Sequence, residues 1–204
     1  MTMPTGRRER KKAATRQKIA DAALWLFLER GYDEVGIRDV AAEADVAVTT
    51  LFSHFASKEA LVFEQDWQFK DRLTRAVTER AADAPLLPAL RQEIHALVAH
   101  CTADGAGPIW NMIAGSAALR EYEESMRLRH AEALAAAIDD DPRLPLTSTA
   151  GRSIARFVVD AYSVAREADD PPAAVDEVFR MIEAAWEVAC PTGPEQGTAE
   201  QTAE

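Results

Sequence analysis

The stretch that most constrains the fold runs from residue 34 to residue 59, where two short apolar patterns flank a tight connection. Four residues of the first pattern recur at helical spacing, namely Ile37, Val40, Ala41 and Ala44. The second pattern follows Asp45 and Val46, a connection too short for anything but a turn. The stretch therefore predicts two short helices joined at a sharp angle.

The second of these helices is predicted to have two different faces. Its apolar side consists of Val48, Leu51, Phe52 and Phe55, and its polar side of Thr49, Thr50, Ser53 and His54. Val48 and Phe52 lie at the edge of the apolar side, so they are also available for contact with a partner. Two short helices with so tight a turn are typical of a helix-turn-helix, whose second helix lies in the major groove of DNA.

Length and composition bound the remaining possibilities. The chain has 204 residues, of which 48% are hydrophobic, enough for one or two compact domains with a real core. No apolar run approaches the roughly 18 residues that a membrane span needs, and the basic N-terminus lacks a signal core. These features predict a cytoplasmic protein with no membrane partner. Cys101 and Cys190 lack metal-like spacing and are predicted to be reduced thiols.

The net charge of −11 is distributed unevenly along the chain. Residues 1–20 hold seven Lys or Arg against one acid, which is a net charge of +6. The net charge is +1 over residues 1–60 and −12 over residues 61–204. Such a chain should dock on DNA through its basic end, with an affinity that falls as salt rises. Arg7 to Lys12 could form a phosphate-contacting arm or a solvated tail; the neighbouring helix-turn-helix favours the arm.

Three runs of sequence resemble the N-terminal domain of the TetR family of transcriptional regulators. They are I-A-D-A-A-L-W-L-F-L-E-R-G-Y at 19–32, I-R-D-V-A-A-E-A-D-V at 37–46, and T-L-F-S-H-F-A-S-K-E-A-L at 50–61. The landmarks that carry the resemblance are Ala22, Ala23, Phe27, Gly31, Tyr32, Ala41, Phe55 and Lys58. Three positions depart from the usual pattern: Gly36 replaces a Thr, Ala47 a Ser, and Phe52 a Tyr. These changes should weaken docking on DNA slightly.

The resemblance and the periodicity together predict an all-α fold, with an N-terminal three-helix helix-turn-helix DNA-binding domain and a C-terminal helical ligand-binding and dimerisation domain. The expected parts are a basic disordered arm (1–12), the DNA-binding domain (13–60), the helical domain (61–190) and a disordered tail (191–204). Helices are expected over about 15–30, for roughly 25 residues from 57 toward Pro85, and over 88–103, 109–114, 116–138, 147–168 and 172–190.

The predicted DNA contacts divide into base-reading and phosphate-binding groups. Side chains placed to meet base edges and methyl groups are Val48, Thr49, Thr50 and Ser53, with Phe52 at the edge of the same surface. Phosphates are assigned to Thr15, Arg16, Arg38, His54 and Lys58. Alternatives stay open for several: a helix cap at Thr15 or Arg16, a surface ion pair at Arg38, and a neutral His54 satisfied by a neighbour.

An effector pocket is predicted more broadly, because bundle cores hold ligands between helices. The large adaptable side chains available to line it are Phe63, Trp67, Trp110, Met112, Tyr122, Phe157 and Tyr162. Ordinary core packing is the alternative for each of them. A small apolar or aromatic effector would suit such a lining.

The last two predicted helices each carry an apolar stripe. In the TetR family the corresponding pair makes a four-helix interface between two subunits. The resemblance therefore implies a homodimer, with one stripe packed inward and the other across the two-fold axis.

Two rival functions are weighed against a DNA-binding regulator. An enzyme is disfavoured because the common nucleotide-binding, zinc-protease and nucleophile-elbow motifs are missing from the sequence, so no catalytic residue and no cofactor are predicted. No metal site is predicted either: His95 and His100 are five residues apart on one helix, and no E-x-x-H motif occurs. A helical protein-interaction module is the second rival; it explains the acidic body but not the basic arm beside the helix-turn-helix.

The sequence thus favours a ligand-responsive repressor that binds a palindromic double-stranded operator as a homodimer and is released by a small-molecule effector.

Overall fold

The computed structural model describes residues 6–63, 66–102 and 106–189, with the side chains of Asp66 and Trp67 outside the description. Within these ranges the chain consists of α-helices joined by turns and loops, with no β-strand. The chain divides into two compact units. The first contains residues 1–71 and 100–129, and the second contains residues 72–99 and 130–204. None of the described helices is both long and apolar enough to cross a bilayer.

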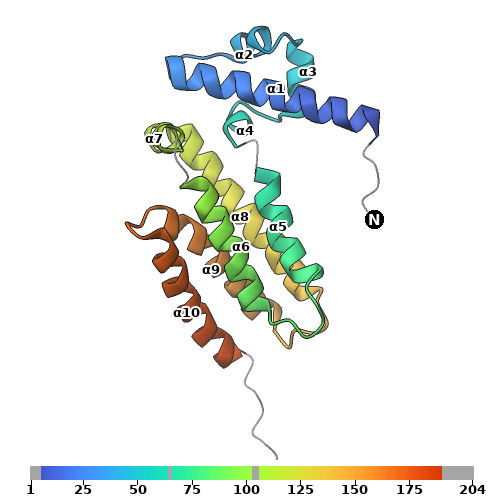
Figure 1. The fold of residues 1–204 in the computed structure, drawn as a ribbon, viewed down its shortest axis with the longest axis vertical. Helices are drawn as coiled ribbons and strands as arrows, with labels where there is room; N and C mark the ends of the chain where they lie inside the picture. Colours follow the sequence, from blue (N-terminus) through green and yellow to red (C-terminus); the bar gives the residue numbers. More distant parts are fainter. Residues whose placement is uncertain (1–5, 64–65, 103–105, 190–204) are drawn as a thin grey trace, which may run out of the picture. The chain divides into compact units, whose positions relative to one another are not determined.

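The first unit is built on α1 (Arg7–Arg30), the long blue helix of Figure 1, against which α2 (Ile37–Glu43), α3 (Val48–His54) and α4 (Glu59–Val62) pack. Its core combines Ile19, Ala23, Leu26 and Phe27 of α1 with Val40, Leu51, Phe55 and Leu61. The 3-4 spacing of the apolar residues in α1 puts them on one face, which covers the shorter helices. α7 (Gly107–Gly115) and the N-terminal part of α8 (Ala117–Asp139) add Ile113 and Leu119 to the same core.

Helix α1 begins eight residues before the predicted start at residue 15, so the expectation of a disordered arm over 1–12 is wrong for residues 7–12. The Gly6 N–H donates to the Glu9 carboxylate over 3.2 Å, and the Arg10 N–H donates to the Gly6 carbonyl over 3.1 Å. A carboxylate three residues after the cap satisfies a free N–H of the first turn and favours the start of the helix. The other end agrees with the prediction: Gly31, with φ of 91°, ends α1.

The predicted helix of about 25 residues after Ser57 is also wrong, because it is divided into α4 and α5 (Asp66–Thr78). Phe63 leaves the helical conformation at φ −101° and ψ 42°, and its side chain is buried in the core of the first unit. Packing of Phe63 therefore overrides the local periodicity. Just before α4, the Ser57 hydroxyl accepts from the Ala60 N–H over 3.3 Å.

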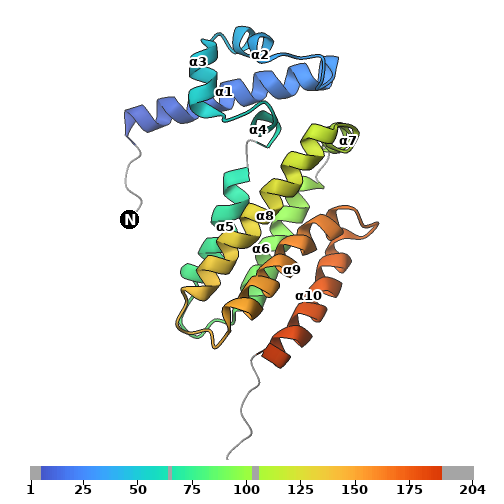
Figure 2. The ribbon, with the colours of Figure 1, turned by 180° about the vertical axis from the view of Figure 1, so that it is seen from behind.

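The second unit contains the C-terminal parts of α5 and α8 and residues 86–99 of α6 (Leu86–Cys101). It also contains α9 (Ser148–Arg166) and α10 (Pro171–Ala189). Figure 2 shows α9 and α10 side by side and antiparallel, joined by a short loop. Their buried faces include Ile154, Val158, Ala161, Val175, Phe179 and Ile182. The helices from 86 onward start and end within about two residues of the predicted ranges. The predicted tail at 191–204 lies outside the described residues.

Candidate nucleic-acid interface

Helix α3 is fixed to the first unit by its apolar side. Leu51 and Phe55 are fully buried, and Val48 is half-buried against the same core. The turn that precedes α3 contains Asp45 at φ 49°, the left-handed conformation that Asp tolerates better than most residues. The Val46 N–H closes this turn on the Ala41 carbonyl over 2.9 Å. Two buried anchors and one sharp turn thus set the rotation of α3.

That rotation exposes the side of α3 predicted to meet DNA bases. Thr49 and Ser53 are exposed, Thr50 is half-buried, and half of the Phe52 surface is accessible. The Ser53 hydroxyl donates to the Thr50 carbonyl over 2.7 Å, which leaves its oxygen available as an acceptor. Side chains that offer hydroxyls, a methyl group and an aromatic ring are suited to base edges and thymine methyls.

Arg16 and His54 meet where α3 ends. The Arg16 guanidinium donates to the His54 carbonyl and lies over the Phe55 ring, 4.1 Å from its centroid. Burial, and then the charges of Lys12 and Arg16, lower the pKa of the His54 imidazole, so the ring is neutral at pH 7. Its Nδ1 is buried without a hydrogen-bond partner among the described residues, so the structure does not provide the neighbour that sequence reasoning offered as an alternative. Arg16 therefore positions the end of α3.

Lys58 lies deeper than a simple phosphate contact requires. Its ammonium donates to the Tyr32 carbonyl over 2.5 Å and lies over the Tyr32 ring, 4.1 Å from the centroid. Burial lowers the pKa of Lys58 despite the opposing charges of nearby carboxylates. The Tyr32 hydroxyl in turn donates to the Glu59 carboxylate over 2.8 Å. Sequence reasoning missed this network, although Tyr32, Lys58 and Glu59 all stand within the runs that it quoted.

The remaining predicted phosphate contacts lie on the surface of the first unit. Thr15 is half-buried in α1, and Arg38 is exposed in the first turn of α2. The neighbouring Asp39 accepts from the Gly36 N–H over 2.8 Å and so caps α2. In the described part of the chain Arg38 forms no ion pair, so the structure does not show the surface pair considered as its alternative.

The predicted effector residues are divided between the two units. In the first, Phe63 stacks on Tyr122 with ring centroids 5.4 Å apart, and the Trp110 indole donates to the Cys101 carbonyl over 2.8 Å. Met112 lines a hollow of about 480 Å³ between the end of α1 and α7, together with Phe27, Leu28, Tyr32, Asn111 and Ser116.

The second unit contains Phe157, which is 51% exposed, and Tyr162, which is half-buried with the Arg166 guanidinium 6.0 Å from its ring centroid. The Trp67 side chain lies outside the described residues. The seven predicted residues therefore do not form one lining within either unit.

Comparison with known proteins finds a family match in the N-terminal part of the first unit. Residues 19–64 match the family model of bacterial regulatory proteins, tetR family. The transcriptional repressor DhaR of Mycobacterium sp. strain GP1 is 30% identical over 96 residues, which cover 47% of this chain and 48% of that protein. The repressor KstR of Mycolicibacterium smegmatis is 42% identical over 67 residues, which cover 33% and 32%. The chain thus spans half or less of the length of these curated relatives.

Solved structures match over most of the chain at low identity. A TetR-family regulator from Streptomyces coelicolor A3 has a TM-score of 0.59 at 18% identity, covering 89% of this chain and 99% of that one. The TetR-family repressor AlkX from Dietzia sp. has a TM-score of 0.58 at 18% identity, covering 84% and 97%. At this identity the likeness concerns the fold. Residues 19–64 therefore match the tetR family of bacterial regulatory proteins, and the chain shares its fold with solved structures of TetR-family regulators.

Proposed function

We propose that this protein regulates transcription by inserting α3 into the major groove of double-stranded DNA. The observation that carries the proposal is the two-sided character of α3: Leu51 and Phe55 are buried, while Thr49, Phe52 and Ser53 are exposed. A helix held rigidly on one side can present the other side to base edges at a fixed register. The relatives named as repressors support the same conclusion.

The proposed assembly is a homodimer formed through α9 and α10. Large apolar side chains are exposed on both helices although each also has a buried face: Phe157 and Val164 on α9, and Met181 and Val188 on α10. Members of each pair are seven residues apart, which puts them on one side of their helix. Two copies related by a two-fold axis would read two half-sites, so the operator is expected to be palindromic.

The proposed mode of action is repression relieved by a small apolar or aromatic effector in the helical domain. Operator binding requires the two α3 helices of the dimer at the separation of the two half-sites, so an effector that favours another separation weakens it. By linkage, the operator weakens effector binding by the same factor. The hollow beside Met112 and the stacked pair Phe63 and Tyr122 are the described parts of the predicted lining. Independent binding of effector and operator would contradict this mode. Such a regulator acts where its DNA is, in the cytoplasm.

The test is selection of bound sequences from random duplex DNA. Wild type is compared with a Thr49→Ala, Thr50→Ala variant and with Thr149→Ala, an exposed threonine of α9. We expect a palindromic consensus that relaxes in the double variant and is unchanged in the control. If the folded wild type enriches no sequence, the proposal fails, and the alternative, a helical protein-interaction module, takes its place.

A further inference from the structure

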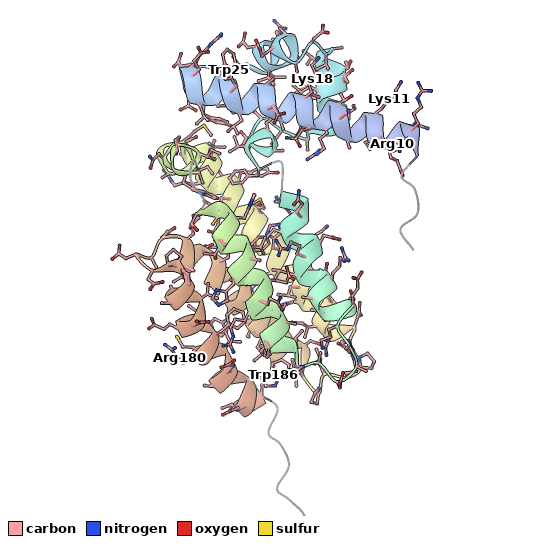
Figure 3. All side chains as sticks on the ribbon, viewed as in Figure 1. Arg10, Lys11, Lys18, Trp25, Arg180 and Trp186 are labelled. Carbon is pink, nitrogen blue, oxygen red and sulfur yellow. The ribbon has the colours of Figure 1, made fainter. Side chains whose placement is uncertain are left out.

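Five cations extend α1 beyond the part that packs against α2 and α3. Arg7, Arg8, Arg10, Lys11 and Lys12 are all exposed. Figure 3 shows Arg10 and Lys11 on these first turns and Lys18 farther along the helix. The one carboxylate in this segment, Glu9, bonds the Gly6 N–H, and within the described ranges none of the five cations has an ion-pair partner. The first turns of α1 therefore carry dense positive charge on a defined helix.

The helix divides these cations between two sides. Arg8, Lys12 and Arg16 follow one another at intervals of four residues, about 6 Å along the axis and about 40° of rotation each, and so form a row within a sector of about 80°. Each of Arg7 and Lys11 is rotated about 100° from the next residue, Arg8 or Lys12, and the two project from an adjacent side that lies about 140–180° from Arg16. A flexible arm would not distinguish these pairs, whereas a helix does.

The row ends at the side of α1 that meets α3. Arg16, at the inner end of this row, donates to the His54 carbonyl at the end of α3. Lys12 is near enough for its charge to lower the pKa of the His54 imidazole. Seven residues of α3 span about 10 Å, close to the width of the major groove, so a groove-bound α3 brings its ends to the flanking phosphates. The row then leads outward from that end of the groove.

We propose that Arg8 and Lys12, held on the helical extension of α1, bind the phosphate backbone of duplex DNA just outside the half-site read by α3. This inference rests on the proposed function, because it requires α3 in the major groove. The contacts add affinity without base preference, since phosphates carry no sequence information directly. A preformed helix also avoids much of the ordering cost that a flexible arm would incur on binding.

The test compares two double variants that lose the same charge. Arg8→Ala, Lys12→Ala removes the outer part of the row, and Arg7→Ala, Lys11→Ala removes the cations of the adjacent side. Binding to the selected operator is measured from 50 to 200 mM salt, once with long flanks and once with the flanks trimmed to the half-sites. Each lost phosphate contact lowers the salt slope by about 0.9, so the row variant should lose about 1.8 per protomer. Across this fourfold salt range its affinity relative to wild type should therefore change about tenfold for each protomer, or roughly 150-fold for a dimer on the operator.

Trimming the flanks should weaken wild type and the control variant but leave the row variant unchanged. If both double variants lower operator affinity and its salt slope equally, the cations act as a diffuse tail and the proposal is overturned. It is also overturned if neither variant changes them. If wild type selects no DNA sequence at all, the proposed function has failed instead. A third variant, Ala13→Gly, Ala14→Gly, keeps every charge but weakens the helix; unchanged operator affinity in it would overturn the role of the rigid extension.

Discussion

Two polar side chains of the DNA-reading unit have roles that their residue types alone do not reveal. His54 is the last residue of α3 and Lys58 follows it by four residues, at positions where a cation or an imidazole is expected to meet phosphate. The structure instead places the Lys58 ammonium on the Tyr32 carbonyl and buries the His54 Nδ1. Sequence reasoning identified the positions but not these partners, because Tyr32 and Lys58 are 26 residues apart and only the fold brings them together.

Replacement of Lys58 by Met should lower the free energy of unfolding by about 1 kcal/mol, since the Tyr32 carbonyl loses its donor. Met keeps an unbranched apolar side chain while removing the charge. Urea denaturation followed by circular dichroism measures the effect, with Lys18→Met as the control because Lys18 is half exposed and lies 4.0 Å from Asp45. Unchanged stability combined with weaker DNA binding would assign Lys58 to phosphate instead.

His54 should make folding sensitive to mild acid. Its pKa in the folded state is lower than the ordinary value of 6.5, so below that value the unfolded chain binds more protons than the folded one. The stability that neutral His54 provides is complete above about pH 6.5 and is lost as the pH falls through the lowered pKa. Urea denaturation between pH 5 and 7.5 should show this slope, and His54→Asn should reduce it. An equal slope in the variant would mean that other groups cause it.

At the scale of elements, the sequence predicted most helices within a few residues but misplaced two boundaries. Apolar periodicity is a local signal, so it locates α3 and the later helices well. The start of α1 was missed because a glycine cap with Glu9 at the third position is weaker in sequence than a Ser or Thr cap. The break after α4 was missed because burial of Phe63 is a tertiary effect.

The loop between α8 and α9 contains a buried network of charged side chains. Asp141, between α8 and α9, is buried and accepts from the Arg80 guanidinium over 2.6 Å and from the Arg143 guanidinium over 2.7 and 2.8 Å. Both arginines also donate to the Val77 carbonyl near the end of α5. This network joins segments more than 60 residues apart in the second unit, and bonds from Arg143 hold the pKa of Asp141 far below its usual range.

Asp141→Asn should therefore destabilise the protein by about 1–3 kcal/mol, because two arginines lose a buried charged acceptor. Asp140→Asn, the exposed neighbour, should change stability little. Because the folded pKa is depressed, the contribution of Asp141 is present above about pH 4 and is lost in stronger acid. Denaturation of both variants at pH 7 and pH 3 measures their free energies of unfolding. If the two variants differ in this free energy by the same amount at both pH values, the assignment to Asp141 is contradicted.

On the scale of the whole molecule, the charge and the apolar surfaces point to different partners. Positive charge is concentrated in the first 20 residues, while the remaining chain is strongly acidic. The exposed apolar side chains of α9 and α10 lie in the acidic part. Sequence reasoning predicted both the basic end and the two stripes, but it could not tell which stripe is buried, because inward and outward apolar faces have the same period.

Met181→Lys, Val188→Lys should convert the proposed dimer to a monomer, because each burial of a large apolar side chain contributes about 1.5–3 kcal/mol. Light scattering at micromolar concentration measures the mass, and Ala173→Lys, exposed near the edge of the stripe, serves as the control. Affinity for a palindromic site should fall with the mass. A wild type that is already a monomer would refute both the interface and the palindrome.

The attachment of α3 has a practical consequence for engineering. Leu51, Phe55 and the left-handed turn at Asp45 hold the helix, while Thr49, Phe52 and Ser53 take little part in holding it. The outer positions can therefore be exchanged as a cassette, with the supporting residues left untouched. A library randomised at those three positions would vary the preferred operator on one constant scaffold.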